Sequence, residues 1–515
     1  MADVEKRNPA DVSKWIIAMT VILPTFIEVM DTSVVNVSLP HIQGSLSAGV
    51  EEVTWVLTSY LVSNAIIIPI SGWLSNVFGR KRYLIFSIVL FIIGSVICGA
   101  APTLALLVFA RVLQGIGGGG LQPISQAILL ESFPVEEHGM AMAIFGMGIV
   151  LAPIAGPVLG GWITDNWTWR WVFYINVPAG ILAVMMASAF IHDPSYVRKK
   201  GIRIDYLGLA FLTVGLGCLQ MFLDKGERAD WFSSDFILTL AIISAVALIG
   251  LVFAELRSKQ PVINLRVFRD RTFAVGNVIM FTGFLTFFSA IVMLPLYLQK
   301  LMGYTSVWAG LVLGPGGLAT LLVMPLAGNL MKKGVKPQGL LALGILISAY
   351  SLWLMSGFTL QADFSAVVWP RVVQAVGMAL FFVPLAAATY VNIAREDMGN
   401  ATGIFNLLRN LGGSIGVAFA TTILSQRSQF HQTALVEHLT PFNPAFQIRM
   451  QQLLQHSGQG GGGATQSKGL LAFVYSQVLR QASMLGFNDT FWILALLSIL
   501  LIPLPFFMRA RRQTY

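Results

Sequence analysis

Long apolar runs recur along this chain and are separated by short polar segments. Fourteen of them are about as long as the 18 or more residues that a helix needs to cross a membrane. The runs are continuous, whereas strands of a membrane barrel alternate apolar and polar positions over about ten residues. The pattern predicts membrane-spanning helices at 15–39, 53–77, 83–101, 104–130, 139–164, 170–191, 205–223, 235–254, 272–299, 305–331, 338–357, 367–391, 399–424 and 486–508.

The composition leads to the same fold class. The chain has 515 residues, of which 56% are hydrophobic and only 11% are charged, and its mean hydropathy is +0.73. A soluble protein carries about 25% charged residues. Cys98 and Cys218 lie within apolar runs, and the six histidines lack the spacing of metal ligands. We predict an all-α integral membrane protein without a metal or cofactor.

The distribution of Lys and Arg predicts the orientation. With both termini in the cytoplasm, the inner segments hold 22 of the 33 basic residues, and the short outer loops hold five, Arg371 among them. Because basic residues concentrate on the cytoplasmic side, we expect cytoplasmic ends at 1–14 and 509–515. The first helix has no cleavage site and is expected to be retained. The pI near 9.6 follows from this bias, so no nucleic-acid partner is expected.

The chain also repeats itself. GWLSNVFGRK at 72 is similar to GNLMKKGVKP at 328, ARVLQGIGGGG at 110 to PRVVQAVGMAL at 370, and GMAMAIFG at 139 to GNATGIFN at 399. The offsets are 256, 260 and 260 residues. They indicate two six-helix bundles, 15–191 and 272–508, with two extra helices (205–223, 235–254) in the linker 192–271. Such parallel repeats, with a substrate path between them, are a transporter architecture.

One long polar segment, 425–485, is expected as an outer loop of the second bundle. It is rich in Gln and contains GQGGGG at 458–463. A partly disordered loop and an element that docks a partner protein are equally compatible with this composition.

The loop after the second run reads GWLSNVFGRKR. Its glycines permit a tight turn and close helix approach, and its cations favour the cytoplasm. Through Gly72, Gly79 and Arg80 it resembles the pattern G-x-L-a-D-r-x-G-R-k of the major facilitator superfamily. Asn76 stands where that family has Asp, so the ion pair usually made there is expected to be lost or weakened.

The fourth run contains RVLQGIGGGG, which resembles the superfamily pattern R-x-x-q-G-x-g through Arg111 and Gln114. An arginine within a span is costly and normally faces a cavity or a partner, although its side chain can also extend to the membrane surface. The resemblance implicates Arg111 in proton transfer.

The fifth run contains APIAGPVLGGW. Small residues let helices approach closely, and a proline adds a kink. Gly156, Pro157, Gly160 and Gly161 resemble the antiporter signature G-P-x-x-G-G, with Ala152 in place of a leading glycine. The resemblance implies export by exchange.

Three further stretches resemble the fourteen-helix drug:proton antiporters, EmrB-type exporters most and QacA-type ones more distantly. MDTSVVNVSLP in the first run, with Asp31, Asn36 and Pro40, resembles D-x-T-x-x-N-x-A-x-P. GGWITDNWTWRWVFYINVPAG (160–180) and FNLLRNLGGSIG (405–416) resemble the same branch. The resemblance implies the major facilitator fold.

The depths of the charged residues suggest a site. At a rise of about 1.5 Å per residue, Asp31 and Arg111 lie at similar depths, so they can pair if their helices are neighbours. Glu28 lies one turn deeper on the same face as Asp31, and Asn64 lies at the depth of Glu28. Arg409 lies near the midplane of the other half.

We expect Asp31 to be the main proton carrier, with Arg111 as its modulator. Burial disfavours an ionised carboxylate and a nearby arginine favours it, so opening the site to either side changes its proton affinity. Glu28 is expected to be a second carrier or a contact for cationic drugs. The alternative is a structural Asp31–Arg111 pair. Residues expected at the substrate cavity are Asn36, Asn64, Gln114, Asn406 and Arg409, of which the last two are equally compatible with packing between helices.

Glu131, Glu136 and Glu137 are interpreted as ordinary loop charges. The sequence has no G-x-x-x-x-G-K-[ST] nucleotide motif, so the proton gradient is the expected energy source. The resemblance implies export of lipophilic or cationic drugs across the bacterial inner membrane. It also implies partners, a periplasmic adaptor and an outer-membrane channel of the EmrA/TolC kind. An exporter of a specific metabolite, lipid or siderophore is the alternative, and a membrane receptor or enzyme a distant one.

Overall fold

The computed structural model describes residues 13–193, 205–258, 260–440, 442–456 and 463–508. Within these residues, fourteen helical segments are long and apolar enough to cross a membrane. The predicted all-α membrane fold with fourteen spans is therefore confirmed.

The helices fall into two sets and an inserted pair. The N-terminal set comprises α1 (Lys14–Ser45), α2 (Val50–Val53), α3 (Trp55–Phe78), α4 (Arg80–Ala100), α5 (Leu104–Gly118), α6 (Leu121–Ser132), α7 (His138–Asn166), α8 (Trp171–Tyr174) and α9 (Asn176–Phe190). The inserted pair is α10 (Tyr206–Lys225) and α11 (Asp235–Arg257). The C-terminal set comprises α12 (Arg271–Lys300), α13 (Ser306–Lys332), α14 (Pro337–Met355), α15 (Phe364–Thr389), α16 (Met398–Val436), α17 (Pro444–His456) and α18 (Gly463–Leu500).

A run of glycines divides the fourth span into α5 and α6. Gly is about 1 kcal/mol less favourable than Ala within a helix, and α5 ends at Gly118 while α6 begins at Leu121. The glycines also let α4 approach closely, because a Cβ on Gly117 would lie 2.5 Å from the backbone nitrogen of Phe91.

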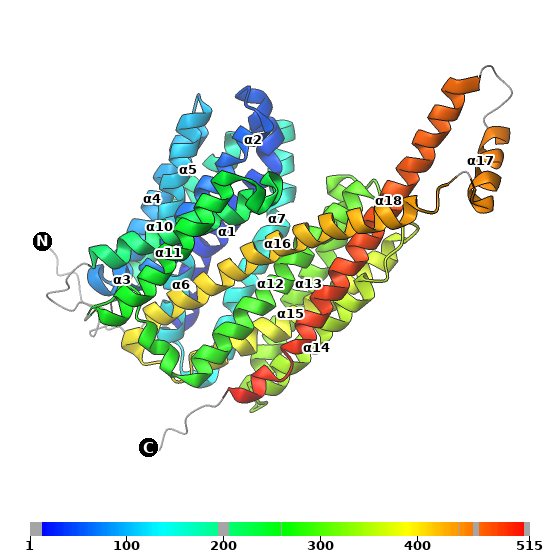
Figure 1. The fold of residues 1–515 in the computed structure, drawn as a ribbon. Helices are drawn as coiled ribbons and strands as arrows, with labels where there is room; N and C mark the ends of the chain where they lie inside the picture. The colour runs from blue at the N-terminus through cyan, green and yellow to red at the C-terminus, as the bar shows by residue number, and fades with distance from the viewer. Residues whose placement is uncertain (1–12, 194–204, 259, 441, 457–462, 509–515) are drawn as a thin grey trace, which may run out of the picture.

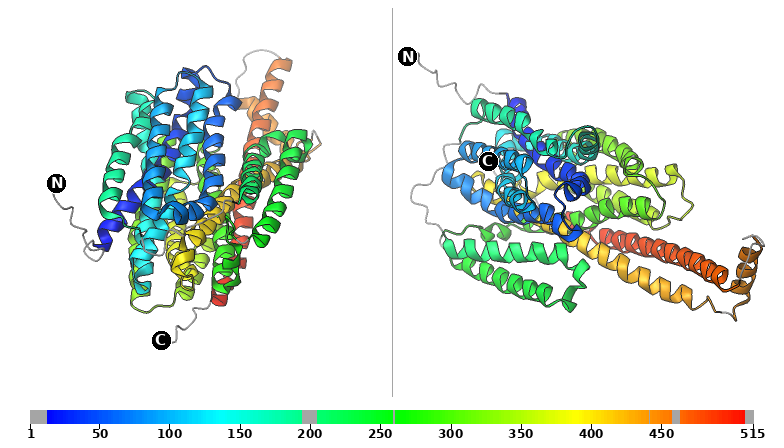
Figure 2. Two further views of the ribbon diagram at one scale, coloured as in Figure 1. Left: turned by 90° about the vertical axis from the view of Figure 1, so that its left-hand side faces the viewer. Right: turned by 90° about the horizontal axis from the view of Figure 1, so that it is seen from above.

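The helices pack closely within each set, and the largest buried apolar cluster includes residues of both sets. In the N-terminal set α1 packs against α7 and α9, and in the C-terminal set α12 packs against α16. The two sets meet through α3 with α16 and α7 with α13. The inserted pair lies beside this junction, where α10 contacts both α3 and α16 (Figure 2).

Both ends of the described chain lie at one end of the bundle, which we call the terminal end. Lys14 donates to Glu137, which also accepts from Lys332 at 3.3 Å. Nearby, Gln338 donates to the backbone oxygen of Met508 at 3.1 Å. The ribbons of the two sets meet toward this end and diverge toward the opposite, far end (Figure 1).

Two equivalent glycine contacts join the sets at the terminal end. Gly72 in α3 faces Gly399 in α16, and Gly328 in α13 faces Gly139 in α7. Gly72 and Gly328 are repeat equivalents, as are Gly139 and Gly399. The junction therefore has the reciprocal form of a twofold interface. A Cβ on Gly328 would lie 3.0 Å from the Gly139 backbone oxygen, and one on Gly72 would collide with the Gly399 backbone.

We expect Gly72→Ala to open the terminal end. The added methyl group has no room against Gly399, and overpacking of this kind costs about 1–3 kcal/mol. The closed conformation should lose population by roughly five- to hundredfold. Val50 and Gln361 are exposed at the far end of the two sets. The distance between spin labels at these two positions, measured by double electron–electron resonance, should become shorter.

Gly339→Ala is the matched control, because a Cβ at Gly339 has nothing within 4 Å. If the two variants gave the same label distances, the Gly72 contact would not determine the conformation.

The segment 425–485, which we call the arm, is helical over most of its described residues. It contains the C-terminal part of α16, all of α17 and the N-terminal part of α18. Figure 1 shows α17 and the start of α18 projecting beyond the far end of the bundle. A disordered loop is therefore the wrong description of this part, while most of GQGGGG (458–462) lies outside the described residues.

Candidate functional site

Asp31 lies in the middle of α1, inside the N-terminal set. Its Oδ2 accepts a hydrogen bond from Nη1 of Arg111 at 2.6 Å, and both side chains are completely buried. Its Oδ1 accepts from Gln114 at 2.8 Å and from Asn176 at 2.7 Å. The pairing expected from the depths is confirmed, and the carboxylate has three donors, one of them fully charged.

Arg111 is held on several sides within the same set. Its Nε donates to the backbone oxygen of Val56 at 3.0 Å, and its Cζ lies 4.1 Å from the centroid of the Tyr60 ring. The side chain is 0% exposed, which rules out extension to the membrane surface in this conformation. Because both charges are out of water, removing either would leave the other unpaired at a cost of about 3–5 kcal/mol.

Glu28 connects the two sets. Its carboxylate accepts from the Tyr60 hydroxyl at 3.1 Å, Asn64 at 3.2 Å and Nε2 of Gln122 at 2.5 Å. The Oε1 of Gln122 accepts in turn from Nη2 of Arg409 in α16. We call the chain Glu28–Gln122–Arg409 the midplane bridge.

The midplane bridge depends on the charge of Glu28. An amide has a donor end and an acceptor end, and Gln122 turns the first to the carboxylate and the second to the guanidinium. A protonated Glu28 carries a hydrogen that needs an acceptor. If Gln122 turned its oxygen to that hydrogen, its NH₂ group would face the cation of Arg409. A proton on Glu28 also removes the charge that strengthens the hydrogen bond from Gln122, and so weakens this contact between the two sets.

Two residues expected at the cavity are completely buried instead. Gln114 belongs to the Asp31 network, and Asn406 donates to Gln126 at 2.7 Å, which ties α16 to α6. For Asn406 the packing interpretation fits this structure better than an open cavity surface, and Gln114 lies inside the N-terminal set and not at a cavity.

The remaining cavity candidates differ in exposure. Asn36 is exposed on α1, five residues beyond Asp31 toward the far end. Asn64 and Arg409 are buried in or against the midplane bridge, and Arg409 lies 5.8 Å from the ring centroid of Phe284.

The sequence matches the profile of the Major Facilitator Superfamily over residues 21–417. The chain belongs to the major facilitator superfamily. It is therefore a transporter and not an enzyme, and a multi-pass protein of the bacterial inner membrane.

Curated relatives place the chain more narrowly within the superfamily. A protein of Haemophilus influenzae described as "Multidrug export protein EmrB" is 38% identical over 490 residues, with 93% of both chains covered. The Escherichia coli K12 protein of the same description is 35% identical over 508 residues, with 98% of both covered. These relatives confirm the resemblance to EmrB-type exporters.

A solved structure confirms the fold. The proton:xylose symporter XylE, bound to 6-bromo-6-deoxy-D-glucose, is 15% identical with a TM-score of 0.62, and 95% of this chain and 94% of that chain are covered.

Two glycines of the superfamily's antiporter signature hold α7 against α1. A Cβ on Gly156 would collide with Ser33, and one on Gly160 would lie 3.1 Å from the backbone oxygen of Val34. Both contacts lie within about one turn of Asp31, so the signature keeps α7 beside the buried network. The other two residues of the signature make no such contact. Pro157 is exposed, and a Cβ on Gly161 would have nothing within 4 Å.

The superfamily loop motif is built around a buried arginine. Arg80 donates to Glu131 at 2.7 Å and to the Ser75 hydroxyl at 2.7 Å, and it is 0% exposed. Gly79 precedes it at φ 97°, a conformation that favours glycine. Asn76 is half-buried. The motif keeps a different ion pair, because Arg80 pairs with Glu131 from α6.

Two of the three glutamates that were interpreted as ordinary loop charges form ion pairs instead. Glu131 pairs with Arg80, and Glu137 joins α1 to α13 through Lys14 and Lys332. The pair of Glu137 with Lys332 joins the two sets at the terminal end, the pair of Glu131 with Arg80 joins α4 to α6 within the N-terminal set, and Glu136 is exposed.

Three polar residues of the spans were missed from the sequence. Asn176 stands in the stretch GGWITDNWTWRWVFYINVPAG (160–180), where an amide within an apolar run was a usable signal. Gln122 follows the glycine run and carries no charge, so nothing marked it. Arg371 was counted in an outer loop, but it lies within α15 and is buried.

Proposed function

We propose that this chain is a proton-coupled antiporter that exports lipophilic and cationic drugs and toxicants from the cytoplasm by alternating access. Relatives described as multidrug export proteins support the substrate range. The observation that carries the proton coupling is the midplane bridge, in which a buried carboxylate joins the two sets through one amide.

The closed terminal end gives the direction of the cycle. If the termini are cytoplasmic, this conformation is closed to the cytoplasm. A proton that reaches Glu28 from outside weakens the midplane bridge and lets the sets separate at the terminal end. Release of the proton to the cytoplasm restores the ionised carboxylate, and the drug is carried outward on the return.

Asp31 is proposed as the main proton carrier, and Arg111 as its modulator. In this conformation the Asp31 carboxylate accepts three hydrogen bonds and is buried away from solvent. It can exchange a proton only when Arg111 and its neighbours move, so its protonation is tied to a rearrangement within the N-terminal set. Glu28 is the second carrier and acts on the contact between sets.

Proteoliposomes with an internal pH-sensitive dye test the proposal. Addition of ethidium or tetraphenylphosphonium to the side that presents the drug site should move protons in the opposite direction, and an imposed pH gradient should drive drug accumulation. A panel of metabolites, lipids and siderophores should give smaller signals. Drug movement that never changes the internal pH would exclude proton antiport.

We further propose that the arm docks a periplasmic adaptor, which leads to an outer-membrane channel. It projects at the end opposite the termini, and it exposes large apolar side chains, among them Phe430, Phe442, Ile448 and Phe473. Cross-linking from these positions to a co-expressed adaptor is the measurement that decides it.

A further inference from the structure

Arg371 is a buried cation within the C-terminal set. It lies seven residues into α15, which is about 10 Å along the helix axis, and its side chain is nine-tenths buried. Its Nη1 donates to Oε1 of Gln374 at 2.6 Å, while its Nε has no hydrogen-bond partner among the described residues.

The internal repeat identifies the counterpart of this residue. Arg371 and Gln374 stand 260 residues after Arg111 and Gln114, and the two pairs make the same hydrogen bond, at 2.6 and 2.7 Å. The local geometry of an arginine and an amide one turn apart is therefore present in both sets.

The two sets differ at the position of the Asp31 carboxylate. The position 256 residues after Asp31 is Phe287, and the centroid of its ring lies 5.8 Å from Cζ of Arg371. Where Arg111 has an anion at 2.6 Å, Arg371 has an aromatic ring. No ion pair to Arg371 is found among the described residues.

Burial of a charge without a counter-charge is costly in a membrane, and such residues mark ligand or ion pathways. A ring gives a cation only part of the stabilisation of a carboxylate. The C-terminal set is therefore short of one negative charge at the place where the N-terminal set has Asp31.

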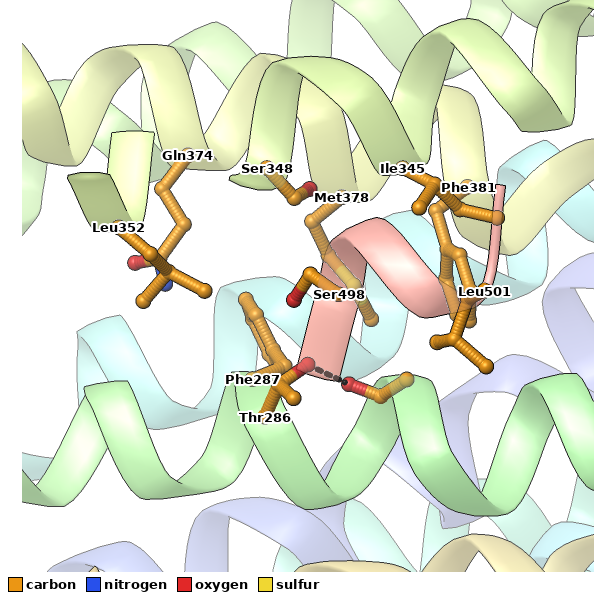
Figure 3. Close-up of a pocket in the computed structure, with 11 residues that line it drawn as sticks. Thr286, Phe287, Ile345, Ser348, Leu352, Gln374, Met378, Phe381, Ser498 and Leu501 are labelled. Carbon is orange, nitrogen blue, oxygen red and sulfur yellow. Dashed lines mark hydrogen bonds between the residues drawn. The ribbon is translucent and has the colours of Figure 1, made fainter. Parts of the chain in front are cut away.

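The surroundings of Arg371 are aromatic. Phe284, Phe287 and Phe288 on α12 contact one another with centroids 5.6–6.1 Å apart, and Phe288 is 38% exposed. On the other side, Gln374 and Phe287 line a pocket between α12, α14, α15 and α18, with polar groups from Thr286 and Ser498 (Figure 3). Gln374 and Phe287, the two neighbours of Arg371, thus also border this small, water-sized pocket.

We propose that Arg371 binds the acid group of aromatic anions, with the carboxylate or sulfonate in the place that Asp31 occupies beside Arg111. Phe287 turns aside, and the three phenylalanines hold the aromatic body. The transport of such anions rests on the proposed export function, but their binding does not.

Binding to the purified full chain in nanodiscs of zwitterionic lipid tests this site. The probes are a radiolabelled naphthylalkanoate and the naphthylalkylammonium with the same carbon skeleton, measured by equilibrium dialysis. Arg371→Gln should weaken binding of the anion at least about tenfold, because it removes a charge-assisted hydrogen bond. Binding of the cation should change less than about twofold on the same scale.

Phe287→Asp is the decisive companion variant. It supplies the carboxylate that the N-terminal set has at this position, so Arg371 is kept but neutralised. We expect it to lose anion binding as Arg371→Gln does, with a melting temperature no lower than that of the parent. Phe287→Leu controls for the loss of the ring and should keep most of the anion affinity.

Equal losses for anion and cation in Arg371→Gln would make the residue structural and overturn the proposal. So would unchanged anion binding in Phe287→Asp. Anion binding without any drug-driven pH change would instead leave this site in place and refute the proposed antiport.

Discussion

Asp31→Asn is expected to abolish drug-driven proton movement. The substitution removes the titratable group and leaves Arg111 buried without its counter-charge, which costs about 3–5 kcal/mol. In proteoliposomes we expect the drug-dependent pH signal to fall to the level of protein-free vesicles. A loss of this kind alone does not separate coupling from folding, because the N-terminal set is destabilised as well.

The double variant Asp31→Asn with Arg111→Gln separates the two roles. It replaces a buried ion pair by two neutral amides, an exchange that is often neutral or stabilising. Its melting temperature should recover while proton movement stays absent. Recovery of proton-coupled transport in the double variant would show that Asp31 and Arg111 only hold helices together.

Glu28→Gln is expected to have the second-largest effect. It imitates the protonated side chain, so Gln122 can no longer serve an anion on one side and Arg409 on the other. Loss of a charge-assisted hydrogen bond between the sets is worth about 1.5–3 kcal/mol, so the closed terminal end should lose population by roughly ten- to hundredfold. Spin labels at Val50 and Gln361 should then report a shorter distance, and this distance should no longer respond to pH.

Gln122→Leu is the matched comparison for the bridge. It breaks the same connection to Arg409 but leaves Glu28 titratable. We expect the same shift in label distance with some proton movement retained. If Glu28→Gln kept the parent's distances and its pH response, Glu28 would have no part in the contact between the sets.

Several features could be predicted from the sequence because they depend on local composition. Runs of apolar residues gave the fourteen spans, and the repeat gave two similar sets. The fixed rise per residue placed Asp31 and Arg111 at similar depths, which allowed them to pair, and the tertiary structure brought their helices together.

Other features required the tertiary structure. Gln122 and Asn176 are uncharged, and an amide in an apolar run gives no indication of its partner. Arg80 pairs with Glu131, which lies 51 residues away in the sequence, and no local pattern indicated this partner. For 425–485 the sequence left a partly disordered loop and a docking element open, and the helices there became visible only in the structure, where α16 and α18 pack against each other.

The sequence by itself determined which segments enter the membrane and that the chain is built twice, since both follow from hydropathy and repetition along one dimension. Only the tertiary structure decided how the charges are compensated. It placed Asp31 beside Arg111 in one set and Phe287 beside Arg371 in the other, and it connected Glu28 to Arg409 through an amide. The reason is physical: the free energy of a buried charge depends on the groups that surround it in three dimensions, and those groups come from helices far apart in the chain.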